Sequence, residues 1–87
     1  MQSFVQNFFT TAKLSELKKK LLITNKIRKL RFENDEMTQN DLASRVGVAR
    51  QTIVAVENAK YFPTLELAFK IAEVFDVNIE AVFTYEP

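Results

Sequence analysis

Apolar residues recur every three or four positions from about residue 25 onward, which is the spacing of amphipathic helices. Short polar stretches separate these segments, and the chain has one Gly and two Pro in 87 residues. The pattern predicts an all-α fold with five helices, at about 25–33, 38–47, 49–58, 64–75 and 79–83. The expected core residues are Ile27, Leu30, Phe32, Leu42, Ala43, Val46, Val48, Ile53, Val56, Leu65, Ala68, Ile71, Ala72, Phe75, Ile79, Val82 and Phe83.

Polar residues mark where these helices begin. Thr38 precedes the second helix and Asp41 follows it by three positions, a shorter relative of the Ser/Thr-x-x-Glu capping box. Pro63 ends any earlier helix, and Thr64 is placed to cap the fourth. We therefore expect side-chain caps at the start of both helices.

The second and third predicted helices are joined by a tight turn. Ala43 lies four residues before Gly47, and a small residue there lets two crossing helices approach closely. Gly47 can adopt the positive φ of a sharp turn without a steric penalty. The arrangement predicts a helix-turn-helix whose second helix presents Arg50 and Gln51 outward, a shape suited to the major groove of DNA.

Residues 1–23 form an N-terminal extension to a domain that we place at 24–87. Phe4, Val5, Phe8, Phe9 and Ala12 fall on one face of a helix, and the stripe can continue through Leu14, Leu17, Leu21 and Leu22. Three interpretations stay open: a helix docked on its own domain, a self-association segment, or a loose segment. The Lys18-Lys19-Lys20 run is a solvated charge run or a phosphate-binding arm.

Composition argues against catalysis. The chain has no Cys and no His, so it lacks thiol nucleophiles, imidazole bases and the usual zinc ligands. Asp35, Glu36 and Asp41 lack the spacing of a calcium loop, and we expect no metal, no cofactor and no enzyme. The absence of a long apolar span predicts a cytoplasmic protein that does not enter a membrane.

Charge is distributed unevenly along the chain. Residues 1–23 hold four Lys and one Glu, whereas residues 24–87 hold eight basic and ten acidic side chains. A domain with this balance can bind DNA only if its basic residues gather on one face. The candidates near the turn are Lys26, Arg28, Lys29, Arg45, Arg50 and Lys60.

The segment from about residue 25 to the end resembles the Xre/Cro family of phage-repressor-type helix-turn-helix proteins. The resemblance lies in Lys29-Leu30-Arg31, Met37-Thr38-Gln39-Asn40-Asp41-Leu42-Ala43, Val46-Gly47-Val48, Arg50-Gln51-Thr52-Ile53, Val56-Glu57-Asn58, Lys60-Tyr61 with Pro63, Leu65-Glu66-Leu67-Ala68 and Ile71-Ala72. It implies a five-helix, lambda-repressor-like domain that binds double-stranded operator DNA as a two-fold homodimer and usually represses transcription. The operator is then expected to be an inverted repeat.

The resemblance also implies roles for individual residues. Contacts to DNA bases are expected from Arg50, Gln51, Val54 and Ala55. Contacts to the sugar-phosphate backbone of the DNA are expected from Gln39, Thr52, Asn58 and Lys60. Structural roles are expected for Ala43, Gly47 and Ile53, and for an Arg31–Glu57 salt bridge that fixes the first helix to the third. If that pair is partly exposed, it contributes at most about 1 kcal/mol.

Four positions depart from the family pattern. Ala49 replaces a Ser or Thr that caps the third helix, and Val54 replaces a polar residue that contacts bases. Ala59 replaces a Gly, and Phe62 replaces a small polar residue. They leave the operator sequence open. An alternative function is an antitoxin-type module that neutralises a partner protein through the extension. The candidate dimer surfaces are the extension and the end of the chain at Val82, Phe83 and Tyr85.

Overall fold

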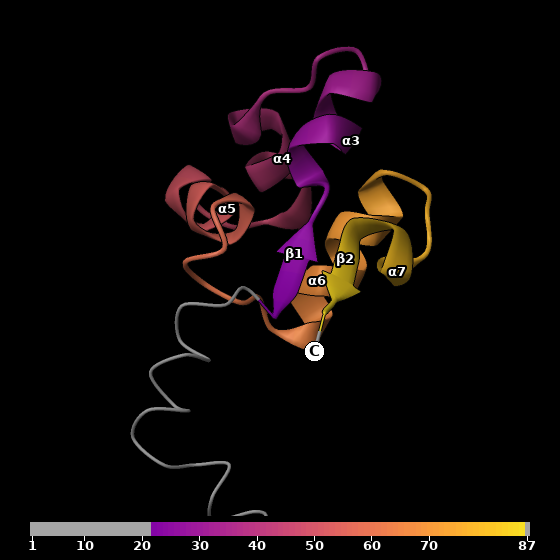
Figure 1. Cartoon of the computed structure of the whole chain (residues 1–87). Coiled ribbons are helices and arrows are strands. Elements are labelled where there is room, and N and C mark those ends of the chain that lie inside the picture. The colour runs from indigo at the N-terminus through magenta and orange to yellow at the C-terminus, as the bar shows by residue number, and fades with distance from the viewer. Residues whose placement is uncertain (1–21, 87) are drawn as a thin grey trace, which may run out of the picture.

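The computed structural model describes residues 22–86. They form five helices and two short strands, in the order β1 (Ile23–Asn25), α3 (Ile27–Glu33), α4 (Gln39–Val46), α5 (Arg50–Glu57), α6 (Leu65–Val74), α7 (Ile79–Val82) and β2 (Phe83–Tyr85) (Figure 1). The five predicted helices and the mainly helical fold class are confirmed. The interpretations of the extension, including a partner bound through it, fall on residues 1–21 and lie outside the described residues.

The predicted caps are present at the starts of α4 and α6. Thr38 Oγ1 accepts a hydrogen bond from Asp41 N at 2.9 Å, and Asp41 Oδ2 accepts one from Thr38 N at 3.2 Å. The backbone N–H of Thr38, and then its hydroxyl, hold the pKa of the Asp41 carboxyl below its usual range, so the group stays ionised at neutral pH. Thr64 Oγ1 accepts from Leu67 N at 3.2 Å. Local sequence therefore sets both helix starts.

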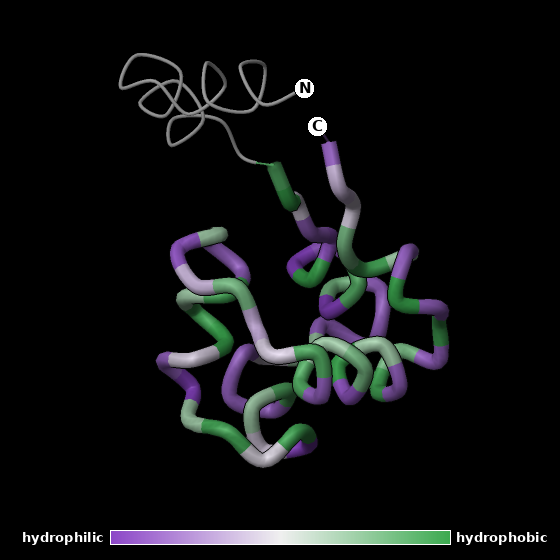
Figure 2. Tube along the Cα trace, turned by 90° about the horizontal axis from the view of Figure 1, so that it is seen from below, coloured by the Kyte–Doolittle hydropathy of each residue, from purple (hydrophilic) through white to green (hydrophobic). Residues whose placement is uncertain are grey.

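One core joins all five helices. Among its completely buried side chains are Ile27 of α3, Leu42 of α4, Ile53 of α5, Ile71 of α6 and Val82 of α7. Figure 2 shows hydrophobic and hydrophilic residues alternating along each helix, as expected when one side faces a common interior. In residues 22–86 no helix has the length and apolar character that crossing a bilayer requires.

A two-stranded antiparallel sheet joins the beginning and the end of the domain (Figure 1). Ile23 pairs with Tyr85 and Asn25 pairs with Phe83. The prediction that the first helix begins at residue 25 is wrong, because Asn25 belongs to β1 and α3 begins at Ile27. The fifth helix ends at Val82, since Phe83 already has extended backbone with φ −118° and ψ 137°.

The buried residues differ from the predicted core at several positions. Phe32 and Leu65 are each 69% exposed, so both were wrongly assigned to the core. At about 100° per residue, Leu65 lies roughly a quarter turn from the middle of the buried stripe of α6, and Phe32 lies far around α3 from Ile27. Leu67 (7% exposed) and Met37 (6% exposed) are buried instead.

Candidate nucleic-acid interface

The turn between α4 and α5 has the predicted geometry. Gly47 has φ 76° and ψ 35°, in the left-handed region, and its N–H donates to Ala43 O. Val48 N donates to the same oxygen at 3.0 Å. Ala43 is only 2% exposed, so its small side chain is buried one turn before Gly47. The left-handed Gly47 and the two bonds to Ala43 O therefore end α4 and turn the chain into α5.

The outer face of α5 is open to solvent. Arg50 and Gln51 are exposed at its start, whereas Val54 and Ala55 are half-buried one turn later. The buried side of the helix carries Ile53, at 0% exposed, and Val56. The predicted base-contacting residues thus fall on the side of α5 that the domain core leaves uncovered. Of the predicted backbone-contacting residues, Asn58 and Lys60 are exposed and Gln39 and Thr52 are half-buried.

The start of α5 lacks a side-chain cap. Ala49 has the extended backbone of an N-cap residue, with φ −72° and ψ 152°, but no side-chain oxygen to accept an amide hydrogen. The expectation that this cap is missing is confirmed.

Ala49→Ser should therefore raise the free energy of unfolding by about 0.5–1 kcal/mol, because the hydroxyl can accept an N–H of the first turn of α5. Urea denaturation followed by circular dichroism would measure the change. Ala49→Val is the matched control: it adds bulk without an acceptor and should give no gain. Equal stabilisation by both variants would show that the missing hydrogen bond is not the cause.

The end of α5 also departs from relaxed geometry. Ala59 has φ 60°, the left-handed conformation that glycine favours, at the position where the family pattern has Gly. Ala59 N donates to Val56 O at 3.0 Å, and Lys60 N donates to Ala55 O at 2.9 Å. These bonds end α5 and hold the backbone of Lys60 against its last turn.

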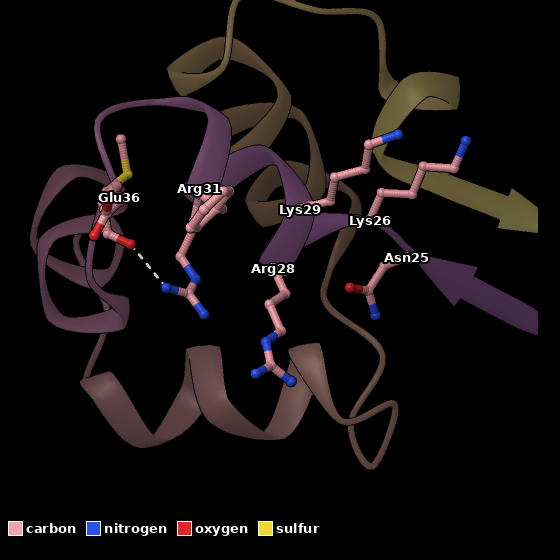
Figure 3. Close-up of a pocket in the computed structure, with 8 residues that line it drawn as sticks. Asn25, Lys26, Arg28, Lys29, Arg31 and Glu36 are labelled. Carbon is pink, nitrogen blue, oxygen red and sulfur yellow. Dashed lines mark hydrogen bonds between the residues drawn. The ribbon is translucent and has the colours of Figure 1, made fainter.

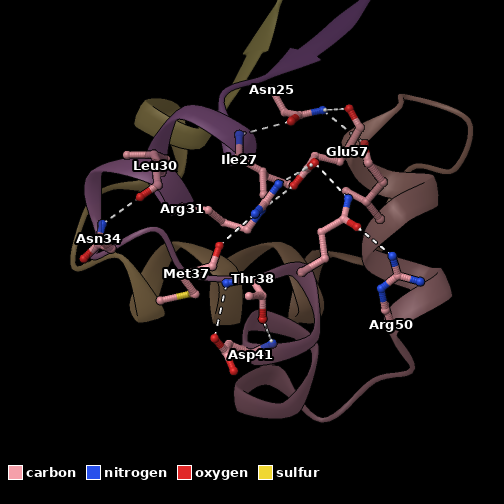
Figure 4. Close-up of polar contacts among 12 residues, drawn as sticks. Asn25, Ile27, Leu30, Arg31, Asn34, Met37, Thr38, Asp41, Arg50 and Glu57 are labelled. Carbon is pink, nitrogen blue, oxygen red and sulfur yellow. Dashed lines mark hydrogen bonds and ion pairs between the residues drawn. The ribbon is translucent and has the colours of Figure 1, made fainter.

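The predicted Arg31–Glu57 pair is present and links α3 to α5 (Figure 4). Arg31 Nε donates to Glu57 Oε2 at 2.7 Å and Nη2 donates to Oε1 at 3.0 Å, which is a bidentate pair. Arg31 Nη1 also donates to Met37 O at 2.7 Å. The side chains are only 15% and 8% exposed, so the pair is more buried than the sequence expectation assumed.

Gln39, at the start of α4, extends this network toward the outer face of α5. Its Nε2 donates to Glu57 Oε1 at 3.0 Å, and its Oε1 accepts from Arg50 Nη2 at 3.5 Å. The contact to Arg50 is at the limit of a hydrogen bond and is exposed, so it restrains the guanidinium only weakly. Glu57 thus connects the first turn of α4, the middle of α3 and the end of α5.

Asn25 has a role that the sequence interpretation missed. Its Nδ2 donates to Val56 O at 3.1 Å and to Glu57 O at 3.3 Å, while its Oδ1 accepts from Ile27 N at 3.1 Å. One amide therefore caps the start of α3 and binds the last carbonyls of α5 (Figure 4). An Asn two positions before a helix is a usable local signal for the first contact but not for the second.

Basic side chains surround a hollow of about 680 Å³ beside α3, lined by residues that include Lys26, Arg28, Lys29 and Arg31. In Figure 3, Arg28 and Arg31 extend from α3 toward α5, whereas Lys26 and Lys29 extend the other way. Arg31 is neutralised by Glu57, and the structure pairs Arg28 with no carboxylate of residues 22–86. Arg28 thus adds positive charge on the α5 side of α3.

Comparison with known proteins agrees with this geometry. The HTH_3 family, described as helix-turn-helix, matches residues 27–82. An uncharacterized HTH-type transcriptional regulator of Methanocaldococcus jannaschii is 60% identical over 50 residues, which are 58% of this chain and 76% of that protein. The cryptic phage CTXphi transcriptional repressor RstR of Vibrio cholerae is 36% identical over 58 residues, 67% of this chain and 51% of that protein.

A solved structure shares the fold. It is described as "a putative DNA-binding protein from Bacteroides fragilis", has a TM-score of 0.64 and 26% sequence identity, and is matched over 71% of this chain and 98% of that one. The family match spans the capped α4, the turn at Gly47 and the open face of α5. The chain therefore belongs to the HTH_3 helix-turn-helix family and is an Xre/Cro-type transcriptional regulator with a helix-turn-helix DNA-binding domain.

Proposed function

We propose that this regulator binds a specific double-stranded DNA operator by inserting α5 into the major groove, and that it thereby represses transcription. The observation that carries the proposal is the open face of α5. Arg50 and Gln51 are exposed on a helix whose opposite side is anchored in the core by Ile53. A helix anchored on one side, with exposed and at most weakly restrained polar side chains at its start, is the geometry that contacts base edges.

Base recognition is assigned to the first two turns of α5. The Arg50 guanidinium can donate to O6 and N7 of guanine, and the Gln51 amide can pair with N6 and N7 of adenine. Val54 and Ala55 follow on the half-buried part of this face, where a thymine methyl is the matching partner. Arg50 is expected to distinguish guanine from the other bases most strongly, because its bidentate contact requires both the O6 and the N7 acceptor.

Backbone contacts are assigned to both ends of the motif. Gln39 lies in the first turn of α4, whose amide groups and helix dipole favour a phosphate. Thr52, Asn58 and Lys60 lie on α5 or just after it. Gln39 Nε2 donates one of its two hydrogens to Glu57, which leaves the second hydrogen for a phosphate, and Gln39 Oε1 loses its weak contact with Arg50 when Arg50 turns toward a base.

The charge distribution supports this orientation. Residues 22–64 carry seven Lys and Arg against five Asp and Glu, whereas residues 65–86 carry one Lys against five acidic groups. The helix-turn-helix half is therefore positive and the half with α6, α7 and β2 is negative. DNA is expected to approach the first and to be repelled by the second.

We further infer a two-fold dimer on an inverted-repeat operator, because two copies of α5 placed one helical turn apart, about 34 Å, read successive major grooves. The relative RstR is named a transcriptional repressor, which favours repression over activation. Val82 is completely buried, so the proposed contact at the end of the chain would have to use Tyr85, which is 65% exposed.

The test begins by selecting bound duplexes from a random pool with the full chain. We expect one inverted repeat to be enriched and the complex to contain two chains. Arg50→Ala should then reduce the preference for one base in each half-site by about tenfold, because a bidentate base contact is lost. Lys60→Ala should weaken binding to specific and random duplexes alike and lower the salt slope by about one unit.

Lys29→Ala is the matched control for Lys60→Ala, since Lys29 extends away from α5 in Figure 3. It removes the same charge and should leave the salt slope unchanged. A selection that enriches no sequence would contradict the proposed function. Equal losses for Arg50→Ala and Lys60→Ala on every duplex would contradict the assignment of base reading to Arg50.

A further inference from the structure

A second surface feature lies away from the helix-turn-helix. It is a hollow of about 340 Å³ lined chiefly by Ile23, Phe62, Pro63, Leu65, Ile79 and Phe83, which we call the apolar hollow. Among residues 22–86, no charged side chain lines it. The residues come from β1, the segment before α6, α6, α7 and β2, and none belongs to α4 or α5.

Two large apolar side chains that line the apolar hollow are exposed to solvent. Phe62 is 54% exposed and Leu65 is 69% exposed, although both are large and apolar. Removing such side chains from water is favourable in proportion to the apolar area covered. A contiguous apolar surface of this kind is a contact site for another apolar segment.

The chain itself enters the domain at the edge of the apolar hollow. Ile23 lines it and begins β1, so Leu21 is only two residues away and within about 7 Å. Side chains alternate between the two faces of a strand, so Ile23, Phe83 and Tyr85 lie on the same face of the two-stranded sheet. Tyr85 is 65% exposed, so the apolar surface continues beside the point where the preceding residues join.

We propose that residues 14–21 of the same chain cover the apolar hollow through Leu14, Leu17 and Leu21. These leucines have the i, i+3, i+7 spacing of one helical face. A helical segment of this length spans about 12 Å, which keeps all three side chains close to Ile23. The apolar stripe that ends at Leu21 can therefore reach the apolar hollow without a linker.

Charge complementarity favours the same occupant. Residues 13–20 contain four Lys and one Glu. The elements around the apolar hollow carry exposed Glu66, Glu73, Glu80 and Glu86, and Lys70 is the only basic residue between 65 and 86. A basic segment with an apolar stripe matches an apolar hollow in the half of the domain whose net charge is negative. Because no lining residue belongs to α5, this docking leaves the proposed DNA-binding face open.

Disulfide trapping tests the proposal directly, because the chain has no cysteine of its own. In the full chain, Leu65→Cys is combined in turn with Leu14→Cys, Leu17→Cys or Leu21→Cys and exposed to oxidised glutathione. At least one pair should form an intrachain disulfide at least tenfold faster than the control pair Leu17→Cys with Gln51→Cys. Electrophoresis without reductant separates intrachain from interchain products.

Two outcomes would overturn the proposal. Predominantly interchain disulfides would assign the apolar hollow to a second copy of the chain. Rates no higher than that of the control pair would show that residues 14–21 do not lie there. Neither outcome bears on operator selection or on the Arg50→Ala measurement, so the proposed function is tested separately.

Discussion

Glu57→Ala should lower the free energy of unfolding by about 3 kcal/mol, measured by urea denaturation. The carboxylate accepts two hydrogen bonds from Arg31 and one from Gln39, and it is 8% exposed. Removing it leaves the Arg31 guanidinium largely buried with only Met37 O as a recorded acceptor among the described residues. A buried charge without its partner costs far more than the pair contributes.

The double variant Arg31→Met with Glu57→Met is the control. It removes both charges and fills the same volume with apolar groups, so it should be within about 1 kcal/mol of the parent. A cost below about 1 kcal/mol for Glu57→Ala would mean that the pair behaves as a solvated surface contact. The double variant should also lose the alignment between α3 and α5, which weaker DNA binding at unchanged stability would reveal.

The second large effect is expected from Ala43→Leu, at about 2–3 kcal/mol of destabilisation. Ala43 is 2% exposed, and its carbonyl accepts the N–H groups of Gly47 and Val48. Three additional carbon atoms at this buried position overpack the core beside the turn, and we expect α4 and α5 to move apart. Thermal denaturation would report the loss of stability, and operator binding should fall further because α5 is reoriented.

Ser44→Leu provides the comparison for this effect. Ser44 follows Ala43 on α4 and is exposed, so the same side chain there should change stability by less than about 0.5 kcal/mol. If both variants were equally destabilised, the burial of Ala43 would not explain the loss, because Leu is a good helix former at either position. If Ala43→Leu bound the operator normally, the close crossing would not be what positions α5.

Local chemistry made much of the fold predictable. The Thr38 and Asp41 cap, the Thr64 cap and the left-handed Gly47 each depend on residues within four positions of one another. The Arg31–Glu57 pair, which spans 26 positions, was instead implied by the family resemblance. The roles assigned to Arg50 and Gln51 remain proposals, since they depend on a nucleic acid that contacts them.

The features that escaped prediction depend on distant parts of the chain. β1 and β2 have three residues each, too few to show an alternating pattern, and their pairing joins Ile23 to Tyr85. Asn25 contacts Val56 and Glu57, 31 and 32 positions away. Met37 is buried outside any helix, so no periodicity identified it. In each case the structure of the residue depends on residues far away in the sequence.

The pairing of β1 with β2 also sets an order of events during synthesis. β1 leaves the ribosome before any of the five helices, and β2 leaves it after all of them. The helix-turn-helix can therefore fold early, through contacts between helices that are adjacent in the sequence. Pairing β1 with β2 must instead bring together segments about sixty residues apart. Until that closure, the backbone groups of Ile23 and Asn25 have no strand partner, and the nascent domain carries an open edge.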